Sequence, residues 1–263
     1  VVRRKDLFVA VFANLAHNEN RILKISESLK AYNDRVKDHF ANSNRFDGSN
    51  TQPFTQYVEG GSQTSIWGVP SLGIDPATGE EIFIRPDGSI TNTWNTNDQV
   101  VLGDTEPKIQ GTFGLNATYK NLSLYMTFMY EAGGQIYNST LRDKVEDVNV
   151  YTSNVDKRVF SERWQEPGDK ARYRKLTSGV GGSIMRTRPT SRFVEDNNVL
   201  TLNSISLGYD FDAGQKWMKT IGLSMLRFEI GANDVCRWSS VKVERGLNYP
   251  YARSFNFSLK AAF

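Results

Sequence analysis

The sequence predicts an all-β fold, and within that class a transmembrane antiparallel β-barrel segment with long extracellular loops. Two observations lead to this prediction. Several stretches of about ten residues or more alternate apolar and polar side chains, and the connections between them are short on one side and very long on the other. Successive side chains of a strand point to opposite faces, so such stretches are strands with one apolar and one polar face. Usual strands have about five or six residues, so these are long.

The clearest pair of strands is expected at 108–119 and 121–132, joined by a tight turn at Lys120-Asn121. Phe128 belongs to the apolar set of the second strand and Thr127 to the polar set. The two runs and their minimal connection predict a long β-hairpin.

Four further strands are expected at 7–18, 199–211, 222–234 and 253–263. The first is entered through a turn at residues 5–6, and the segment between the second and the third contains the short helical pattern QKWMKT. The last strand ends the sequence on an aromatic residue. Its apolar side presents Phe255, Phe257, Leu259, Ala261 and Phe263, and its polar side presents Ser254, Asn256, Ser258, Lys260 and Ala262.

The connections segregate by length. They are short near residues 5–6, 119–121 and 212–222, whereas the segments 26–107, 133–197 and 235–252 are predicted as long loops. Short turns at one rim and long extracellular loops at the other are typical of outer-membrane barrels, and a β-sandwich has no reason to separate them. Strands can cross a bilayer only if their sheet closes, and the smallest such barrels have about eight strands, so six strands predict a part of a larger barrel.

The long loops are expected to contain structure of their own. Residues 25–40 space apolar side chains at three to four residues and predict an amphipathic helix capped by Ser26 or Ser28. Residues 73–91 predict a turn, a short strand, a Pro-Asp-Gly turn and a second short strand. The acids of the first turn, namely Asp75, Glu80 and Glu81, lack the spacing of a calcium loop, so a plain turn is favoured. The glycine-rich stretch 179–183 matches no phosphate-binding motif.

Composition excludes several classes of function. The 32 basic and 29 acidic residues give a net charge of +3 without a basic stripe, so nucleic acid is not expected as a partner. A single cysteine, Cys236, excludes an internal disulfide. The two histidines, His17 and His39, lie in no catalytic or zinc-binding motif. We therefore expect no enzyme activity, no cofactor and no metal site.

Six stretches together carry a resemblance to a known family. They are GIDPATGEEIF (73–83), PKIQGTFGLNATYKNLSLYMTFMY (107–130), YNSTL (137–141), DKRVFSERWQEPGD (156–169), TSRFVEDNNVLTLNSISLGYDF (190–211) and SSVKVERGLNYPYARSFNFSLKAAF (239–263). In order, in spacing and in the terminal phenylalanine, the chain resembles the carboxy-terminal part of SusC/RagA-type TonB-dependent receptors of Bacteroidota.

The resemblance implies a fold, a location and a function. The chain would supply the last six strands of a 22-stranded barrel in the cell outer membrane, crossing it many times with its carboxy terminus periplasmic. In this family a plug domain and a TonB-contacting segment lie upstream, and neither is expected within these residues. The resemblance further implies import of oligosaccharides or peptides with a SusD-like surface lipoprotein, energised by TonB. The expected partners are thus the remaining barrel and plug, the lipoprotein, TonB, membrane lipid and the substrate.

Two groups of candidate site residues follow. Aromatic residues of the predicted loops could stack on a sugar or peptide, although each could equally pack a loop or sit at a membrane interface. These are Tyr57, Trp67, Trp94, Trp164, Trp238, Tyr249 and Tyr251. The apolar positions of the terminal strand resemble the signal that outer-membrane assembly machinery reads, and the alternative is an ordinary edge strand. They are Phe255, Phe257, Leu259 and Phe263.

Two other function classes stay open at this point. A surface glycan-binding β-sandwich would share the loops and aromatics, but its strands would pack against a second sheet. A glycoside hydrolase would need two convergent carboxylates, which the sequence does not indicate. The β-sandwich and the barrel differ in what each face of the strands contacts. Phe128 and Phe257 are assigned to lipid and Thr127 and Ser258 to the lumen, while Arg227 and Glu229 would form a lumen charge network or a plain cross-strand pair.

Overall fold

A computed structural model describes residues 1–44, 46, 48–152, 154–176, 184–212, 214–242 and 253–263. The chain divides into two compact units. The sheet unit comprises residues 1–18, 107–133 and 197–263, and the loop unit comprises residues 19–106 and 134–196. Tyr249, Tyr251 and the glycine-rich stretch 179–183 fall outside the described residues.

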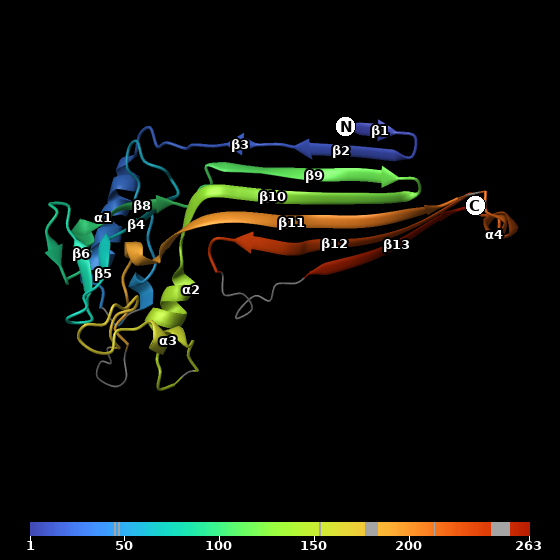
Figure 1. Cartoon of the computed structure of the whole chain (residues 1–263). Helices are drawn as coiled ribbons and strands as arrows, with labels where there is room; N and C mark the ends of the chain where they lie inside the picture. Colours follow the sequence, from blue (N-terminus) through green and yellow to red (C-terminus); the bar gives the residue numbers. More distant parts are fainter. Residues whose placement is uncertain (45, 47, 153, 177–183, 213, 243–252) are drawn as a thin grey trace. The chain divides into compact units, whose positions relative to one another are not determined.

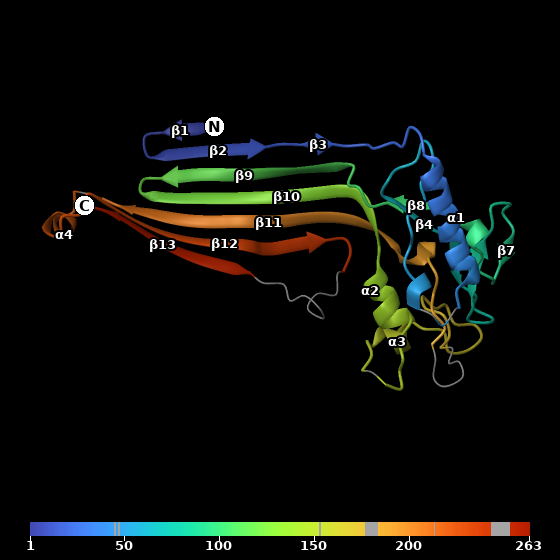
Figure 2. The same ribbon diagram turned by 180° about the vertical axis from the view of Figure 1, so that it is seen from behind.

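The sheet unit is built on one antiparallel sheet. Its strands are β1 (Val2–Arg4), β2 (Leu7–Ala13), β3 (Ala16–His17), β9 (Ile109–Tyr119), β10 (Leu122–Tyr137), β11 (Val194–Phe211), β12 (Met225–Ser239) and β13 (Ser254–Ala262). They lie in the order β1-β2-β9-β10-β11-β12-β13, with β3 also paired to β9 (Figures 1 and 2). Among the described strands β1 and β13 pair with one neighbour each, so the sheet is open.

Several predicted boundaries need correction. The first strand is not continuous, because β2 and β3 are separated at Asn14-Leu15. At this break the Asn14 amide bonds Thr112, with the Thr112 N–H donating to Asn14 Oδ1 at 2.7 Å. β10 and β11 each run about five residues beyond their predicted outer ends, and both contribute residues to the two units. β12 begins at Met225 and ends at Ser239, so Trp238 and Cys236 lie on a strand rather than in a loop.

The register places the predicted apolar and polar sets on opposite faces. Phe128 lies directly across from Phe113, and their rings stack with centroids 4.9 Å apart. Phe257 lies across from Ile230, whereas the neighbouring Ser258 lies across from Glu229. Residues paired across a ladder share a face, so the apolar alternation of each strand merges with that of the next. From the short turns to the middle of the sheet, one face is therefore apolar apart from Arg4, and the other carries the charges.

A short helix lies at one end of the sheet unit. α4 (Lys216–Thr220) lies in the connection between β11 and β12, where the QKWMKT pattern predicted a helical turn. Met218 of this helix is fully buried. The Trp217 ring packs edge-on against Phe211, with centroids 5.9 Å apart.

The loop unit contains short strands and helices. They are α1 (Glu27–Asn42), η1 (Gly48–Asn50), β4 (Ser65–Gly68), β5 (Ser71–Ile74), β6 (Glu81–Ile84), β7 (Ile90–Thr91), η2 (Thr96–Asp98), β8 (Val100–Asp104), α2 (Ser139–Leu141), η3 (Arg142–Glu146), α3 (Arg158–Ser161) and η5 (Ser191–Phe193). The predicted helix is present, and of its two candidate caps Ser26 accepts the Leu29 N–H. The strands β6 and β7 are the two short strands predicted within 73–91, and β5 pairs with β6 as a third strand that was not predicted.

Two apolar clusters hold the loop unit together. Val36 and Phe40 bring α1 onto Val69, Phe83 and Trp94. A second cluster gathers Ile66, Tyr137, Leu141, Val145, Val159, Tyr173 and Phe193. Residues far apart in the sequence thus share cores, and the first two predicted long loops fold as a packed body. Most of the third, residues 243–252, lies outside the described residues. No helix in the described part of the chain is long and apolar enough to cross a membrane.

Candidate functional site

The polar face of the sheet carries a charge cluster centred on Arg227 of β12. Its guanidinium lies 2.9 Å from Asp210 on β11 and 3.3 Å from Glu229 on its own strand. It also donates to the Ser123 hydroxyl on β10, at 2.9 Å. One arginine therefore links three adjacent strands on the face where the sequence predicted charges.

A glycine makes this reach possible. Gly208 of β11 lies between Arg227 and Ser123, and a Cβ there would stand 2.6 Å from Arg227 Nη2 and 2.6 Å from Ser123 Oγ. No real side chain tolerates contacts this short, so any other residue at 208 would displace the arginine. Because Gly208 has no side chain, the Arg227 guanidinium can cross β11 and reach Ser123 on β10.

The opposite face of the sheet is apolar and exposed. On β13 the exposed fractions of Phe255, Phe257 and Leu259 are 66%, 71% and 68%. Exposure is not confined to this edge strand, because Leu207 and Ile230 of the inner strands β11 and β12 are exposed as well. A contiguous apolar surface of this kind indicates contact with another apolar medium or protein.

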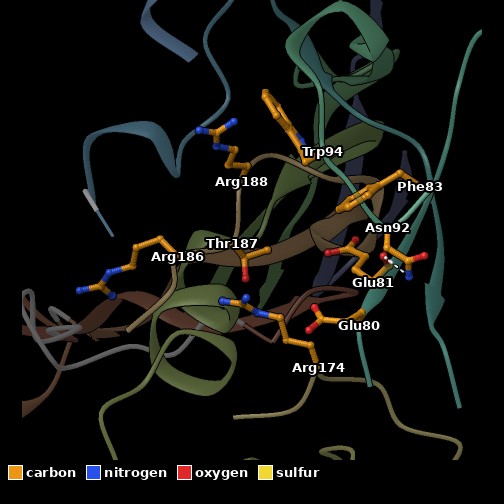
Figure 3. Close-up of a pocket in the computed structure, with 9 residues that line it drawn as sticks. All are labelled: Glu80, Glu81, Phe83, Asn92, Trp94, Arg174, Arg186, Thr187 and Arg188. Atoms are coloured by element: carbon orange, nitrogen blue, oxygen red, sulfur yellow. Dashed lines mark hydrogen bonds between the residues drawn. The ribbon is translucent and has the colours of Figure 1, made fainter. Parts of the chain in front are cut away.

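The loop unit is organised around buried charges. The Arg192 guanidinium contacts Glu81 through two bonds of 2.8 Å and Glu146 through one of 2.8 Å. Arg174 lies 3.3 Å from Glu146 and 3.1 Å from Asp147. Glu146 of η3 and Asp147, which follows it, are thus both paired, and the network connects β6, the end of η3 and the segment before β11. Figure 3 shows Glu81 and Arg174 of this network.

The surroundings of Glu81 favour its ionised form, whereas burial raises the pKa of Asp147. Burial acts to raise the pKa of Glu81, but the charge of Arg192 and hydrogen bonds from Arg192, Thr190 and Ser71 outweigh it. The pKa of Glu81 consequently lies below its ordinary value. The Thr190 hydroxyl donates to Glu81 at 2.6 Å, which completes the coordination of the carboxylate.

The enclosed space beside this network is small. Glu81, Arg174, Thr187 and Trp94 are among the residues that line a cavity of about 20 Å³ (Figure 3). Such a volume accommodates about one water molecule and neither a sugar nor a peptide. The buried charges therefore hold the loop unit together and do not form a ligand pocket.

A larger, open hollow lies elsewhere on the loop unit. Its volume is about 360 Å³, and its lining includes Gln52, Thr55, Gln63, Thr105 and Tyr137. All of its lining residues are uncharged. Amides and hydroxyls that both donate and accept hydrogen bonds suit a neutral polar ligand.

The structure separates the aromatic candidates into different surroundings. Trp94 is buried, its Nε1 donates to the Pro189 carbonyl at 2.9 Å, and the Arg188 guanidinium lies 4.8 Å from the indole ring. The Trp164 Nε1 donates to the Pro76 carbonyl at 2.9 Å, and its ring covers Gly79. These two tryptophans pack the loop unit.

The remaining described candidates are more open. Tyr57 and Trp67 are half-buried, and the Tyr57 ring lies 5.8 Å from that of Tyr32. Trp238 is exposed on β12, in the other unit. The aromatic candidates are thus not gathered into one site.

The acidic turn is occupied by internal contacts. Asp75 accepts the Ala77 N–H at 2.9 Å and the Thr78 hydroxyl at 2.7 Å, and these bonds lower its pKa. Glu80 pairs with Lys175 at 3.0 Å and Glu81 with Arg192. Among the described side chains no group of three or more His, Cys, Asp and Glu could hold a metal ion.

Sequence reasoning missed the buried arginines of the loop unit. Residues 142–192 contain eight arginines, a density that could have indicated a salt-bridged body. The sequence contains no signal of their pairing, because Glu81 and Arg192 are 111 positions apart.

Known proteins resemble this chain along its whole length. TonB-dependent receptor P3 of Formosa agariphila is 23% identical over 288 residues, a match that covers 100% of this chain and 27% of that receptor. TonB-dependent receptor P26 of the same organism is 24% identical over 149 residues, covering 57% of this chain and 14% of that receptor. No protein-family model matches the chain.

Solved structures share the fold. The RagAB peptide transporter superposes with a TM-score of 0.75 at 20% identity, covering 100% of this chain and 28% of that one. The RagAB peptide importer in its closed-closed state gives 0.71 at 21% identity, with the same coverage. The predicted resemblance to SusC/RagA-type TonB-dependent receptors is confirmed.

The chain corresponds to only part of these proteins. It spans about a quarter of the length of the receptors it matches. Its fold is that of part of a RagA-type barrel, and its relatives are receptors and transporters rather than enzymes. The three-strand Arg227 cluster and the exposed apolar face belong to this barrel wall.

Proposed function

We propose that the chain forms part of the wall and the extracellular loops of a TonB-dependent importer in the outer membrane. The observation that supports this most is the sheet with one exposed apolar face and one charged face. Apolar side chains facing lipid and polar side chains facing a lumen are the arrangement of transmembrane barrels. In a glycan-binding β-sandwich the apolar face would pack on a second sheet, and among the described residues of the sheet unit there is only one.

The open sheet needs further strands to close. Unpaired backbone N–H and C=O groups at its edges cannot lie in hydrocarbon, where each would cost several kcal/mol. The remainder of the receptor supplies the partners of β1 and β13 in this proposal, together with the plug. The loop unit then lies on the extracellular side, and the carboxy terminus is periplasmic.

Import requires gating rather than chemistry. Substrate binds between the loops and a SusD-like lipoprotein that acts as a lid, and TonB uses the proton gradient of the inner membrane to displace the plug. The pairing of RagA-type receptors with a second protein in RagAB supports such a partner. The Arg227 cluster provides part of the polar lumen wall.

The substrate is an oligosaccharide or a peptide. The neutral hollow around Gln52, Thr55 and Gln63 supports either class, since peptide groups and sugar hydroxyls both donate and accept hydrogen bonds. Tyr57 and Trp67 of the same unit are candidate contacts, while Trp94 and Trp164 contribute through packing.

The terminal strand has a second role in this proposal. Phe255, Phe257, Leu259 and Phe263 are exposed on the apolar side of β13 and form the signal that outer-membrane assembly machinery reads. Replacing Phe263 by serine should lower the amount of assembled receptor, while replacing Lys260 on the polar face should not. Equal effects of the two changes on outer-membrane levels would contradict a signal role.

Cell fractionation and uptake test the function together. The receptor that contains this segment should require detergent for extraction, and protease added to intact cells should cut a site inserted at Gly88 but not one at Asn121. Uptake of labelled oligosaccharide or peptide should stop when TonB is deleted. Recovery of the protein in aqueous solution as a compact monomer would refute the barrel and favour the sandwich.

A further inference from the structure

The short connections of the sheet unit form a continuous rim. The Lys120 N–H donates to the Asp6 carbonyl at 2.8 Å, and the Asp210 N–H to the Asn121 carbonyl at 2.9 Å. The Ser224 N–H donates to the Ala262 carbonyl at 2.8 Å. The β1–β2 turn, the β9–β10 turn and the α4 connection therefore stand at one end of the sheet (Figure 1).

Aromatic side chains lie along the apolar face just inside this rim. Tyr119 of β9 is 54% exposed, and Tyr209 of β11 packs on Phe211, which in turn contacts Trp217 of α4. Trp217 itself is 43% exposed, and Ile221 after α4 is 54% exposed. Amphipathic aromatic rings at this depth mark a boundary between hydrocarbon and the polar headgroups of a bilayer.

Basic side chains lie at the same boundary. Arg4, Lys5, Lys120, Lys216 and Lys219 are exposed, and within the described part of the chain none forms a salt bridge. Over residues 4–6, 120–121 and 212–224 these five cations stand against Asp6 and Asp212, which gives 5 − 2 = +3. Arg4 lies across from Leu7, on the apolar face itself. The paired residues of that face between this end and the middle of the sheet are uncharged.

The cations are placed to reach headgroups. The Lys120 ammonium lies 5.5 Å from the centroid of the Tyr119 ring, so it stands directly above the aromatic row. Lysine and arginine near a bilayer boundary extend their charged ends to the headgroup level. Lys216 and Lys219 flank the buried Met218, and Trp217 of the same helix packs on Phe211 of β11.

We propose that this rim binds the headgroups of anionic phospholipids, with the aromatic row at the acyl boundary and Lys120, Lys216 and Lys219 on the phosphodiesters. Unpaired cations beside exposed apolar and aromatic surface complement a lipid that is anionic at one end and apolar at the other. The proposal rests on the membrane assignment made above, and it adds which lipid chemistry the short-turn side selects.

Thermal unfolding of the whole receptor in detergent, with phosphatidylglycerol or phosphatidylcholine titrated in, tests the rim. Phosphatidylglycerol should raise the unfolding temperature at lower concentration than phosphatidylcholine. The triple variant K120Q/K216Q/K219Q should lower this preference by at least about tenfold, since each cation near an anionic surface contributes roughly fivefold. Added salt should weaken the preference of the unmodified receptor, because the rim is exposed.

Two control variants isolate the rim. K24Q/K37Q/K170Q removes three exposed lysines of the loop unit and should leave the preference intact. K120R/K216R/K219R keeps the charges and should retain it. The same stabilisation by water-soluble glycerol 3-phosphate would show a free phosphate site, and equal effects of the two lipids would show no headgroup selection. Either result would refute lipid binding at the rim without affecting the proposed barrel. If the receptor does not enter micelles or bilayers at all, the membrane assignment itself is refuted.

Discussion

Replacing Phe257 by arginine should destabilise the receptor in a bilayer by about 2–4 kcal/mol. Phe257 lies near the middle of β13, a strand of 9 residues. At about 3.4 Å per residue the strand is roughly 30 Å long, and a tilt of about 40° reduces its span along the membrane normal to roughly 23 Å. That span matches the apolar band of about 25 Å in outer-membrane barrels, so position 257 is close to the midplane, where a charge costs most.

The matched control is Ser258→Arg. Ser258 is the next residue on the same strand, faces the opposite side and lies across from Glu229, which can pair with an arginine. Thr127 is a poorer control, although the sequence assigns it to the same lumen face, because its hydroxyl is buried. Facing alone should therefore separate Phe257→Arg from Ser258→Arg.

Chemical unfolding of the receptor reconstituted in lipid vesicles measures both variants. Phe257→Arg should shift the denaturant midpoint by an amount equivalent to about 2–4 kcal/mol, and Ser258→Arg should stay within about 0.5 kcal/mol of the unmodified receptor. If the two variants lose the same free energy of unfolding, or if Ser258→Arg loses more, the apolar face does not meet lipid.

Four other changes probe the charge cluster and the loop unit. Gly208→Ala should break the contact from Arg227 to Ser123 of β10 at a cost of about 1 kcal/mol or less. A structure of the variant with that contact intact would show that a glycine is not required at position 208. Arg192→Ala should cost about 3–5 kcal/mol in local stability by hydrogen exchange, because buried Glu81 loses its arginine and Glu146 keeps only Arg174. A loss below about 1 kcal/mol would contradict the network. The pKa of Glu81 lies below its ordinary value of 4.5, so the ionised carboxylate stabilises the fold above that pH. This stability is lost as the pH falls through the pKa of Glu81 in the folded state. Glu81→Gln should therefore flatten the acid side of the pH–stability curve. Trp94→Phe should lower loop-unit stability by about 1–2 kcal/mol through its lost hydrogen bond, and a loss of substrate affinity at unchanged stability would assign it to binding instead.

The alternation of apolar and polar residues in the sequence predicted most strands of the sheet unit. Alternation along 108–132 determined which side of the hairpin Phe128 occupies, since a strand has a fixed period of two. The same alternation did not predict where the strands end. β12 continues to Ser239 and carries Trp238, because pairing with β11 extends the ladder into residues whose own alternation is weak.

The loop unit shows where local patterns stop. α1 was predictable because Leu29, Tyr32 and Val36 repeat at helical spacing and Ser26 can cap it. Which partner covers that face was not, since Val69 and Trp94 come from later, irregular segments. The aromatic candidates likewise looked equivalent in sequence, and only their surroundings distinguished Trp94 in a core from the half-buried Trp67.

The sequence by itself determined the class of fold, the apolar and polar faces of the strands and the family resemblance, because these depend on periodicity and order along the chain. Only the tertiary structure decided that Arg227 spans three strands over Gly208, that Glu81 meets Arg192, and that three separate turns line up as one basic and aromatic rim. Each of these depends on register between segments distant in sequence, and register is set by pairing energies across the sheet or core rather than by any one segment.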